Sequence, residues 1–273
     1  MTNLLNTHKS LRRAIAIGLA SLVLATTPAL SQDAANKGFE VAAKSDRSDR
    51  GFGDSTVILS MVLKNAAGAE STRSMAMTTL ELPDESIGDR SLVRFDSPAD
   101  IEGTSLLSHA QIIDADDQWL FLPALKRVKR ISSRNKSGPF VGSEFAFEDI
   151  TGQELEKYDH VWVREEACGD LMCDVVERKP RYENSGYTRQ LVWIDQSDAQ
   201  FRKIEYYDRK NDLLKTQTFE DYKLYEGKFW RSQLFRMENH QTGKSTVLKF
   251  SDYTFNTGLT DRDFVKGVLK RQR

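Results

Sequence analysis

Hydrophobic and polar residues alternate along much of the chain from residue 55 onward. Over 55–63, Val57, Leu59 and Met61 face one way, which is the period of a strand with one buried face. Similar segments follow, separated by turn sequences such as Glu226-Gly227. The segments predicted as strands are 55–63, 72–82, 90–96, 105–113, 118–122, 158–167, 173–179, 187–195, 201–209, 213–225, 228–238 and 245–254.

Many short strands separated by turns predict a barrel or a strongly curved sheet, with antiparallel pairing between successive hairpins. Helical signals are few: a polar, Ala-rich segment over 33–47, a candidate between Pro123 and Ser132, and a last helix. The last helix begins at the capping-box-like Thr260-Asp-Arg-Asp263, and Phe264 and Val268 share one of its faces. We predict a mainly β fold in which one antiparallel sheet forms a barrel or curves strongly, accompanied by few helices.

Some predicted strands are apolar on both faces. In 118–122, Trp119 and Phe121 point one way, and Leu120 and Leu122 point the other. A single sheet with water on its outer side does not need this pattern. Something therefore covers the second face in places, either helices and loops or a bound apolar ligand.

The N-terminal segment has the layout of a secretory signal peptide. Lys9, Arg12 and Arg13 precede an uncharged apolar stretch over 14–25, and Ala29-Leu30-Ser31 has the form of a cleavage site. The apolar stretch is too short to span ~30 Å of hydrocarbon. We predict a signal peptide over 1–31, one domain over 32–273, and a protein that is soluble in a bacterial periplasm after cleavage.

Composition limits the function classes. The chain has 273 residues, 39 Lys+Arg against 40 Asp+Glu, and a formal net charge of −1. This balance argues against a nucleic-acid partner, because nucleic-acid binders show a basic excess. Hydrophobic residues make up 39% of the chain, which is enough to build a core and excludes a wholly disordered chain.

The chain has two cysteines, Cys168 and Cys173, on either side of a Gly169-Asp170 turn. In an oxidising compartment a disulfide between them is the default expectation, and it would stabilise the hairpin by about 2 kcal/mol. A metal site lacks histidines nearby, and a redox pair would be spaced Cys-x-x-Cys. We therefore expect a structural disulfide and no metal.

A basic stretch follows the strand at 118–122. Gln118–Ser143 holds six basic residues and no acidic residue, whereas Glu144–Asp159 has a local charge of −5. The stretch is either a solvated loop paired with its acidic neighbour or a basic rim that meets lipid phosphates or an acidic partner. Ser137-Gly-Pro139 favours a mobile loop. The proposed rim consists of Lys126, Arg127, Lys129 and Arg130.

Catalytic signals are weak. His109, His160 and His240 fit no metal-ligand pattern, and the sequence has neither a Gly-x-Ser-x-Gly elbow nor a phosphate-binding glycine loop. Asp159-His160 could orient a serine, but no nucleophile is indicated. We expect a protein that is not an enzyme and that uses no cofactor.

Four segments carry a resemblance to a known family: Arg50-Gly-Phe-Gly-Asp54, residues 94–107, Gln118-Trp-Leu-Phe-Leu-Pro-Ala-Leu-Lys-Arg-Val-Lys-Arg-Ile131 and Gly142-Ser-Glu-Phe-Ala-Phe-Glu-Asp-Ile150. In the order of the segments and in their amino-acid residues, they resemble the bacterial outer-membrane lipoprotein-sorting proteins, which have the LolA/LolB-like fold. The chain looks most like the longer branch, whose members are often found beside exporters of the resistance-nodulation-division type.

The resemblance implies a single curved antiparallel sheet that forms a half-open barrel capped by a few helices, with an apolar cavity for acyl chains. It also implies a carrier or acceptor of lipid or acylated lipoprotein, which we expect to be a monomer. An acyl chain of ~16 carbons needs about 12 kcal/mol of shielding to cross water. The alternative role is an accessory protein that docks on an inner-membrane exporter and holds no cargo. The aromatic residues of the resembling segments are either core or cavity wall: Phe95, Trp119, Phe121, Phe145 and Phe147.

Overall fold

The computed structural model describes residues 27–84, 86–152 and 154–270. Residues 1–26, which hold most of the predicted signal peptide, lie outside the described residues. The helix α1 spans Thr27–Asp49. It contains the predicted helix 33–47 and also the predicted cleavage site, so processing after Ser31 would shorten α1 by its first five residues.

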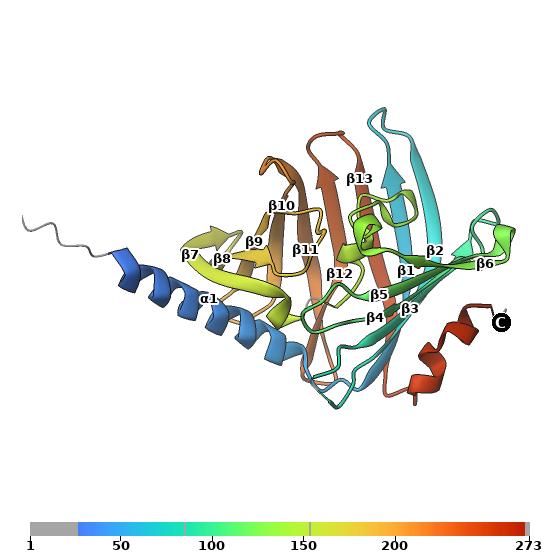
Figure 1. The fold of residues 1–273 in the computed structure, drawn as a ribbon, viewed down its shortest axis with the longest axis horizontal. Helices are drawn as coiled ribbons and strands as arrows, with labels where there is room; N and C mark the ends of the chain where they lie inside the picture. Colours follow the sequence, from blue (N-terminus) through green and yellow to red (C-terminus); the bar gives the residue numbers. More distant parts are fainter. Residues whose placement is uncertain (1–26, 85, 153, 271–273) are drawn as a thin grey trace, which may run out of the picture.

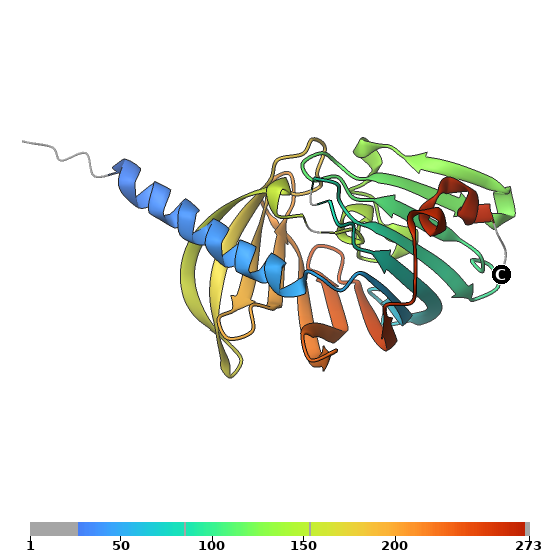
Figure 2. The same cartoon turned by 90° about the horizontal axis from the view of Figure 1, so that it is seen from below.

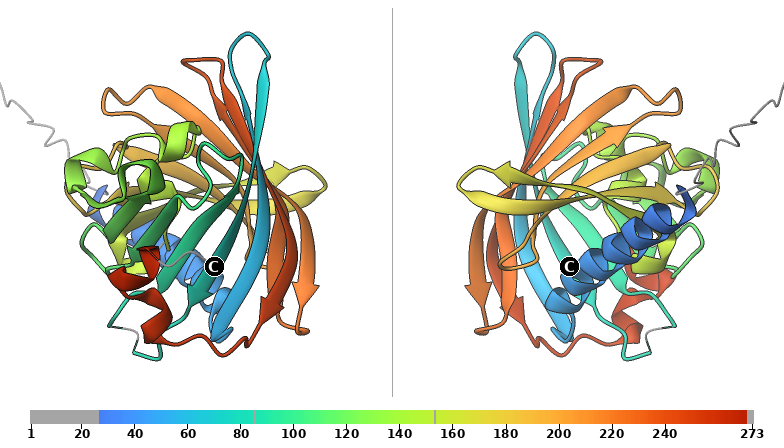
Figure 3. Two further views of the ribbon diagram at one scale, coloured as in Figure 1. Left: turned by 90° about the vertical axis from the view of Figure 1, so that its right-hand side faces the viewer. Right: turned by 90° about the vertical axis from the view of Figure 1, so that its left-hand side faces the viewer.

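The described strands form one antiparallel sheet of 13 strands that curves into an open half-barrel (Figures 1 and 3). This confirms the mainly β, curved fold predicted from the alternation. The strands are β1 Asp54–Lys64, β2 Glu70–Leu80, β3 Arg90–Ser97, β4 Ser105–His109, β5 Asp117–Leu122, β6 Arg127–Ile131, β7 Tyr158–Cys168, β8 Leu171–Pro180, β9 Arg189–Asp195, β10 Phe201–Tyr207, β11 Leu213–Tyr225, β12 Phe229–Asn239 and β13 Ser245–Phe255. The short 3₁₀ helices are η1 Pro123–Leu125, η2 Ser133–Asn135, η3 Phe140–Gly142, η4 Phe147–Asp149, η5 Leu155–Lys157, η6 Asp261–Phe264 and η7 Lys266–Lys270.

The strand order in the sheet is β6-β5-β4-β3-β2-β1-β13-β12-β11-β10-β9-β8-β7. The chain runs outward from β1 to one edge of the sheet at β6. It then crosses to the opposite edge through residues 132–157, which we call the crossing segment, and returns from β7 to β13. The first and last strands pair at the middle of the sheet, with Val62 opposite Val247.

Two of the helices predicted from sequence differ in the structure. The candidate between Pro123 and Ser132 is a single 3₁₀ turn followed by β6, which pairs with β5 so that Val128 lies opposite Phe121. The pairing with β5 determines this strand, because its five residues have a weak period of their own. At the C-terminus the predicted capping box of Thr260 and Asp263 is present, but it begins η6 and then η7 rather than an α-helix.

Helix α1 packs on the edge strand β7. A Cβ atom at Gly38 would lie 2.5 Å from the backbone nitrogen of Trp162, so only glycine permits this close approach. Lys37 Nζ lies 3.6 Å from the centre of the Trp162 ring. Further along α1, Lys44 Nζ donates a hydrogen bond to the carbonyl oxygen of Gln196 (3.0 Å), in the turn between β9 and β10. These contacts fix α1 against the edge of the sheet.

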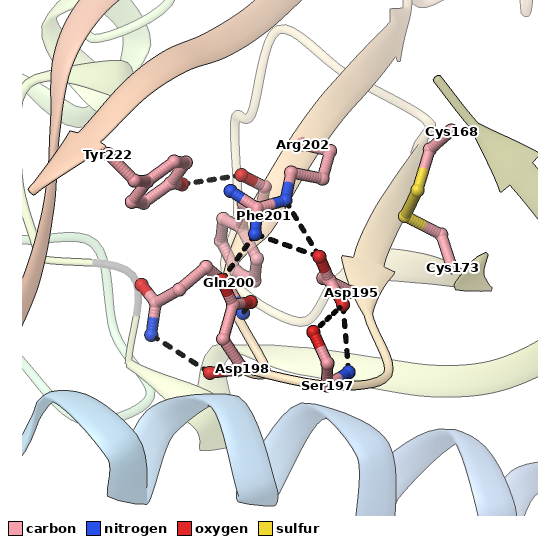
Figure 4. Close-up of a disulfide and its surroundings, with 9 residues drawn as sticks. All are labelled: Cys168, Cys173, Asp195, Ser197, Asp198, Gln200, Phe201, Arg202 and Tyr222. Atoms are coloured by element: carbon pink, nitrogen blue, oxygen red, sulfur yellow. Dashed lines mark hydrogen bonds and ion pairs between the residues drawn. A yellow bond between two sulfur atoms is a disulfide. The ribbon is translucent and has the colours of Figure 1, made fainter. Parts of the chain in front are cut away.

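The predicted disulfide is present (Figure 4): Cys168 and Cys173 are bonded across the hairpin of β7 and β8. Cys173 is fully buried beside Val175 and Trp193. The neighbouring β9–β10 turn is held by the Asp195 carboxylate, which accepts hydrogen bonds from the Ser197 hydroxyl (2.7 Å) and the Arg202 guanidinium (2.8 Å), as Figure 4 shows. The disulfide and this turn therefore stiffen the end of the sheet on which α1 rests.

Apolar side chains pack on both sides of the first half of the sheet. The concave side holds the main core, which includes Val93 and Leu106 and is covered by the crossing segment. The outer side of β3–β5 carries a second cluster in which Leu107 packs against Phe264 and Leu269 of the C-terminal segment. Figure 2 shows that segment lying along these strands. Protein segments thus cover both faces here, as the two-sided pattern of 118–122 requires.

Candidate functional site

A cavity of about 360 Å³ lies between the concave face of the sheet and the crossing segment. Its size falls in the usual range for small-molecule pockets. One wall consists of inward-facing residues of β1–β4, and the opposite wall comes from β12 and β13, including Phe235, Leu248 and Phe250. The cavity is therefore enclosed by the two halves of the sheet where they curve toward each other.

The wall formed by β1–β3 is arranged in rows, because paired strands bring residues level with one another. Val57 pairs with Met77, and Met77 pairs with Val93. Two residues further inward, Leu59 pairs with Met75. These five side chains line the cavity, and all are apolar, so this part of the wall can contact an alkyl chain without leaving a polar group unpaired.

The crossing segment covers the inner end of the cavity with Phe140 and Phe145, which are essentially fully buried. The Phe140 ring lies 5.7 Å from the Phe95 ring and 5.6 Å from the Phe147 ring, centre to centre. The backbone N–H of Phe140 donates to the carbonyl oxygen of Phe145 (2.7 Å). The segment is thus a packed wall, in contrast to the mobile loop predicted from Ser137-Gly-Pro139.

A second cavity of about 320 Å³ adjoins the first toward α1. The two cavities share lining residues, among them Phe52, Phe235 and Tyr253. The second cavity also reaches Ala42 of α1 and Phe201 of β10. The open space therefore extends along the concave face from β4 to the helix, and its lining becomes more polar toward α1.

Charged side chains lie where the two cavities meet. Asp49 forms an ion pair with Arg231, and both residues line both cavities. The Arg231 guanidinium carbon also lies 5.4 Å from the centre of the Phe52 ring. Burial raises the pKa of Asp49, and Arg231 opposes that shift. The Asp49 side chain is nevertheless 54% accessible, because it faces the open space of the cavities.

Asp89 is a second carboxylate at this boundary, and it also lines both cavities. Burial raises the pKa of Asp89 to about 6, and the hydrogen bond from the Leu82 N–H (3.1 Å) opposes the shift. Glu154 and Glu81 raise the pKa further by charge repulsion. Arg90 follows Asp89 and lines the first cavity. Together with Arg231, these carboxylates give the boundary between the two cavities both signs of charge.

The five aromatic residues predicted as cavity wall are divided among three positions. Phe145 lines the cavity, and Phe95 and Phe147 are buried in the core beside Phe140. Trp119 and Phe121 lie on the outer side of the sheet, in the cluster with the C-terminal segment, and are not among the cavity-lining residues. The physical reason is that their own strand turns Leu120, not Trp119 and Phe121, toward the concave core.

The predicted basic rim lies on the edge strand β6 and the turn before it. Lys126, Arg127, Lys129 and Arg130 are exposed, and none of them lines the cavity. Lys129 pairs with Leu120 and so shares the concave side of the sheet, whereas Arg130 forms an ion pair with Asp117. The cavity reaches only as far as β4, two strands away from β6. The expectation that the strand leads directly from an apolar wall to a cationic mouth is therefore not met.

Most residues of the cavity wall were not predicted from the sequence. Met75, Met77, Phe235 and Phe250 all occupy inward positions of correctly predicted strands. Their alternation was the available signal. It marks a buried face, but it does not tell a filled core from a hollow one, because that depends on where the crossing segment lies.

The three histidines of the described chain have ordinary structural partners. His109 Nε2 lies 2.7 Å from the carbonyl oxygen of Phe264, His160 Nε2 lies 3.0 Å from that of Leu155, and His240 contacts Thr216. Within the described ranges, no group of three or more His, Cys, Asp or Glu residues is placed to hold a metal ion. The described part of the chain also contains no helix that is long and apolar enough to cross a bilayer.

Comparison with known proteins gives relatives of nearly full length. The model of a protein family described as an uncharacterized protein matches residues 88–271. A crystal structure described as an outer membrane lipoprotein-sorting protein domain from Vibrio parahaemolyticus is 52% identical, with a TM-score of 0.84 over 87% of this chain and 100% of that chain. No curated protein matches the chain.

Two further solved structures are similar. A DUF1329 family protein from Desulfovibrio piger is 29% identical, with a TM-score of 0.82 over 86% of this chain and 99% of that chain. A LolA superfamily protein from Nitrosomonas europaea is 24% identical, with a TM-score of 0.68 over 85% of this chain and 98% of that chain. The last comparison shows a shared fold.

Proposed function

The chain belongs to the outer-membrane lipoprotein-sorting protein family, with a LolA-like fold, and on this premise we propose that it is a periplasmic carrier or acceptor of lipid or acylated lipoprotein that acts without catalysis. The observation that carries the proposal is the apolar cavity between the half-barrel and the crossing segment. An acyl chain of ~16 carbons exposes methylenes that cost about 12 kcal/mol in water. The rows formed by Val57, Leu59, Met75 and Met77 offer the apolar surface that offsets this cost.

The first test is direct detection of a ligand. Purified protein is extracted with organic solvent and analysed by mass spectrometry, and the delipidated protein is titrated with a fluorescent fatty acid. We expect an acyl lipid in the extract and saturable binding. Protein that is free of lipid and binds no fatty acid would contradict the carrier proposal and favour an accessory protein that docks on an exporter.

A matched pair of variants locates the binding. Met77→Trp places a large ring in the cavity, because Met77 lines it. Ile58→Trp adds the same ring on the outer side of the neighbouring strand, where Ile58 is 39% exposed. We expect Met77→Trp to weaken fatty-acid binding at least tenfold and Ile58→Trp to leave it unchanged. Equal binding by both folded variants would mean that the cavity is not the site.

Export to the periplasm is part of the proposal. It is supported by the signal-peptide pattern of 1–31 and by the Cys168–Cys173 disulfide, which suits an oxidising compartment. We expect the exported protein to begin at Gln32. N-terminal sequencing of periplasmic material that finds an intact Met1 would contradict this part of the proposal.

We propose that the basic edge strand β6 meets an anionic membrane or partner during transfer. Arg127 and Lys129 share the concave side of β6 and are exposed. Their reversal, Arg127→Glu with Lys129→Glu, should slow lipid transfer from anionic vesicles, and more so at low salt than at high salt. The control reverses two exposed lysines of β11 and β13, Lys223→Glu with Lys249→Glu. If both pairs slow transfer equally, only net charge matters and β6 has no specific role.

A further inference from the structure

Four hydroxyl side chains form a row across the inner face of four neighbouring strands. Ser55 on β1 pairs with Thr79 on β2, Thr79 pairs with Ser91 on β3, and Ser91 pairs with Ser108 on β4. All four residues line the 360 Å³ cavity. Side chains of directly paired residues point to the same face and lie about 5 Å apart. We call this row the hydroxyl strip; it crosses an otherwise apolar wall at one level.

The hydroxyl strip has spare hydrogen-bonding capacity. Ser55, Ser91 and Ser108 are more than nine-tenths buried, with exposed fractions of 7%, 8% and 2%. Among the described residues, no protein group forms a hydrogen bond with the hydroxyls of Ser55, Thr79 or Ser91, and Ser108 Oγ accepts one weak bond from the Gln118 amide (3.4 Å). Each hydroxyl carries a proton to donate. Because these hydroxyls are open to the cavity, the strip is suited to a ligand that accepts hydrogen bonds.

The position of the strip orders the chemistry along the cavity. Asp89 precedes Ser91 by two residues and lies on the side of the strip away from Val93, where it lines both cavities. Val57 and Met77 form the next row inward, one strand period of ~6.8 Å from the strip. Along β1–β3, the cavity lining therefore runs from charged, through hydroxyl, to apolar side chains. An amphiphile has the same order: a polar head, a linkage and an alkyl chain.

We propose that the hydroxyl strip binds the carbonyl oxygen of an acyl ester or amide, with the alkyl chain directed toward Phe140 and Phe145 and the head group toward Asp89. This inference rests on the proposed carrier function and names its substrate class. A carbonyl oxygen accepts hydrogen bonds, so it satisfies donors that an alkyl ether satisfies poorly. A site built to hydrogen-bond a ligand discriminates strongly against an analogue that lacks the group, because its own polar atoms are then left unpaired.

The test compares an ester with an ether of equal chain length and head group. 1-Monopalmitoylglycerol and 1-O-hexadecylglycerol each compete with a bound fluorescent fatty acid, on the wild-type protein and on Thr79→Val/Ser91→Ala. We expect the wild-type protein to bind the ester about tenfold more tightly than the ether. The variant keeps side-chain volume but lacks two donors, so it should bind the two competitors within twofold of each other.

The control variant removes the same two groups from the outer side of the sheet, as Ser60→Ala/Thr78→Val, and should keep the tenfold preference. Circular dichroism checks the fold, and Ser55→Ala/Ser108→Ala is the second variant if the first fails to fold. A wild-type protein that binds ester and ether equally, or a strip variant that keeps the preference, overturns the hydroxyl-strip proposal. A wild-type protein that binds neither competitor nor the fatty acid overturns the carrier function instead.

Discussion

At the scale of single residues, the ionisable groups around the junction of the two cavities are not in ordinary surroundings. Burial raises the pKa values of Asp49, Asp89 and Glu154, and each lies where the cavities approach α1. Of these, Asp89 has a pKa of about 6. A carboxyl with a raised pKa favours the neutral form in the folded state, so ionised Asp89 opposes folding at neutral pH.

The substitution Asp89→Asn should therefore stabilise the protein at neutral pH. Below about pH 3 the carboxyl is largely protonated in folded and unfolded chains alike, and the cost appears between about pH 3 and 6, where the unfolded chain ionises first. After allowance for solvent screening, we expect a gain of about 1 kcal/mol in the free energy of unfolding at pH 7.5 and almost none at pH 3. Urea unfolding at both pH values measures it. Asp96→Asn, at an exposed position, is the control, and an equal gain at both pH values would contradict the explanation.

Single residues also show what the alternation of apolar side chains along a strand cannot predict. Alternation correctly predicts that Trp119 and Phe121 share one face and Leu120 the other. It does not say which face is concave, because strands alternate symmetrically. That choice is made by residues far away in sequence, Phe264 and the crossing segment, through tertiary packing.

At the scale of elements, most strands could be predicted because each has one buried face and a turn at its end. β6 could not, since its residues Arg127–Ile131 are mainly basic and gain their conformation from pairing with β5. Basic residues on an edge strand also oppose pairing with another chain. The start of the C-terminal helical segment was predicted correctly, but its helix type was not. Its tight 3₁₀ turns follow from the way it lies on the outer side of β3–β5.

The C-terminal segment should stabilise the sheet without contributing to ligand binding. Phe264 is 1% exposed in the outer cluster, so Phe264→Ala should lower the free energy of unfolding by about 3 kcal/mol. Val265→Ala is the control, because Val265 is 47% exposed. Urea unfolding gives the stability, and fatty-acid titration of the folded variant should give an unchanged affinity. A lost affinity with intact fold would place this segment in the binding site.

At the scale of the whole molecule, the crossing segment joins the two halves of the half-barrel over the cavity. On the first half, Gln118 Nε2 of β5 donates to the carbonyl oxygen of Phe147 (2.9 Å). On the second half, Lys215 of β11 forms a buried ion pair with Asp149 (2.6 Å) and donates to the carbonyl oxygen of Glu144 (2.9 Å). The segment therefore acts as a cover held by polar contacts on both sides, and no local sequence pattern could have predicted contacts between residues so distant in the chain.

If this cover controls access to the cavity, weakening its attachment should speed ligand exchange. Lys215→Met leaves Asp149 buried without its cation, which should cost about 3 kcal/mol in unfolding free energy. Part of this destabilisation should lower the free energy of local opening of the crossing segment. We therefore expect a bound fluorescent fatty acid to dissociate several-fold faster in stopped-flow displacement.

The double variant Asp149→Asn/Lys215→Met removes the unpaired charge as well. It should recover much of the stability and of the slow ligand release, because breaking a buried ion pair costs more than replacing it. Lys210→Met, at an exposed lysine of the adjacent turn, should change neither quantity. A destabilised Lys215→Met that releases its ligand at the wild-type rate would mean that the ligand leaves by a route that the crossing segment does not cover.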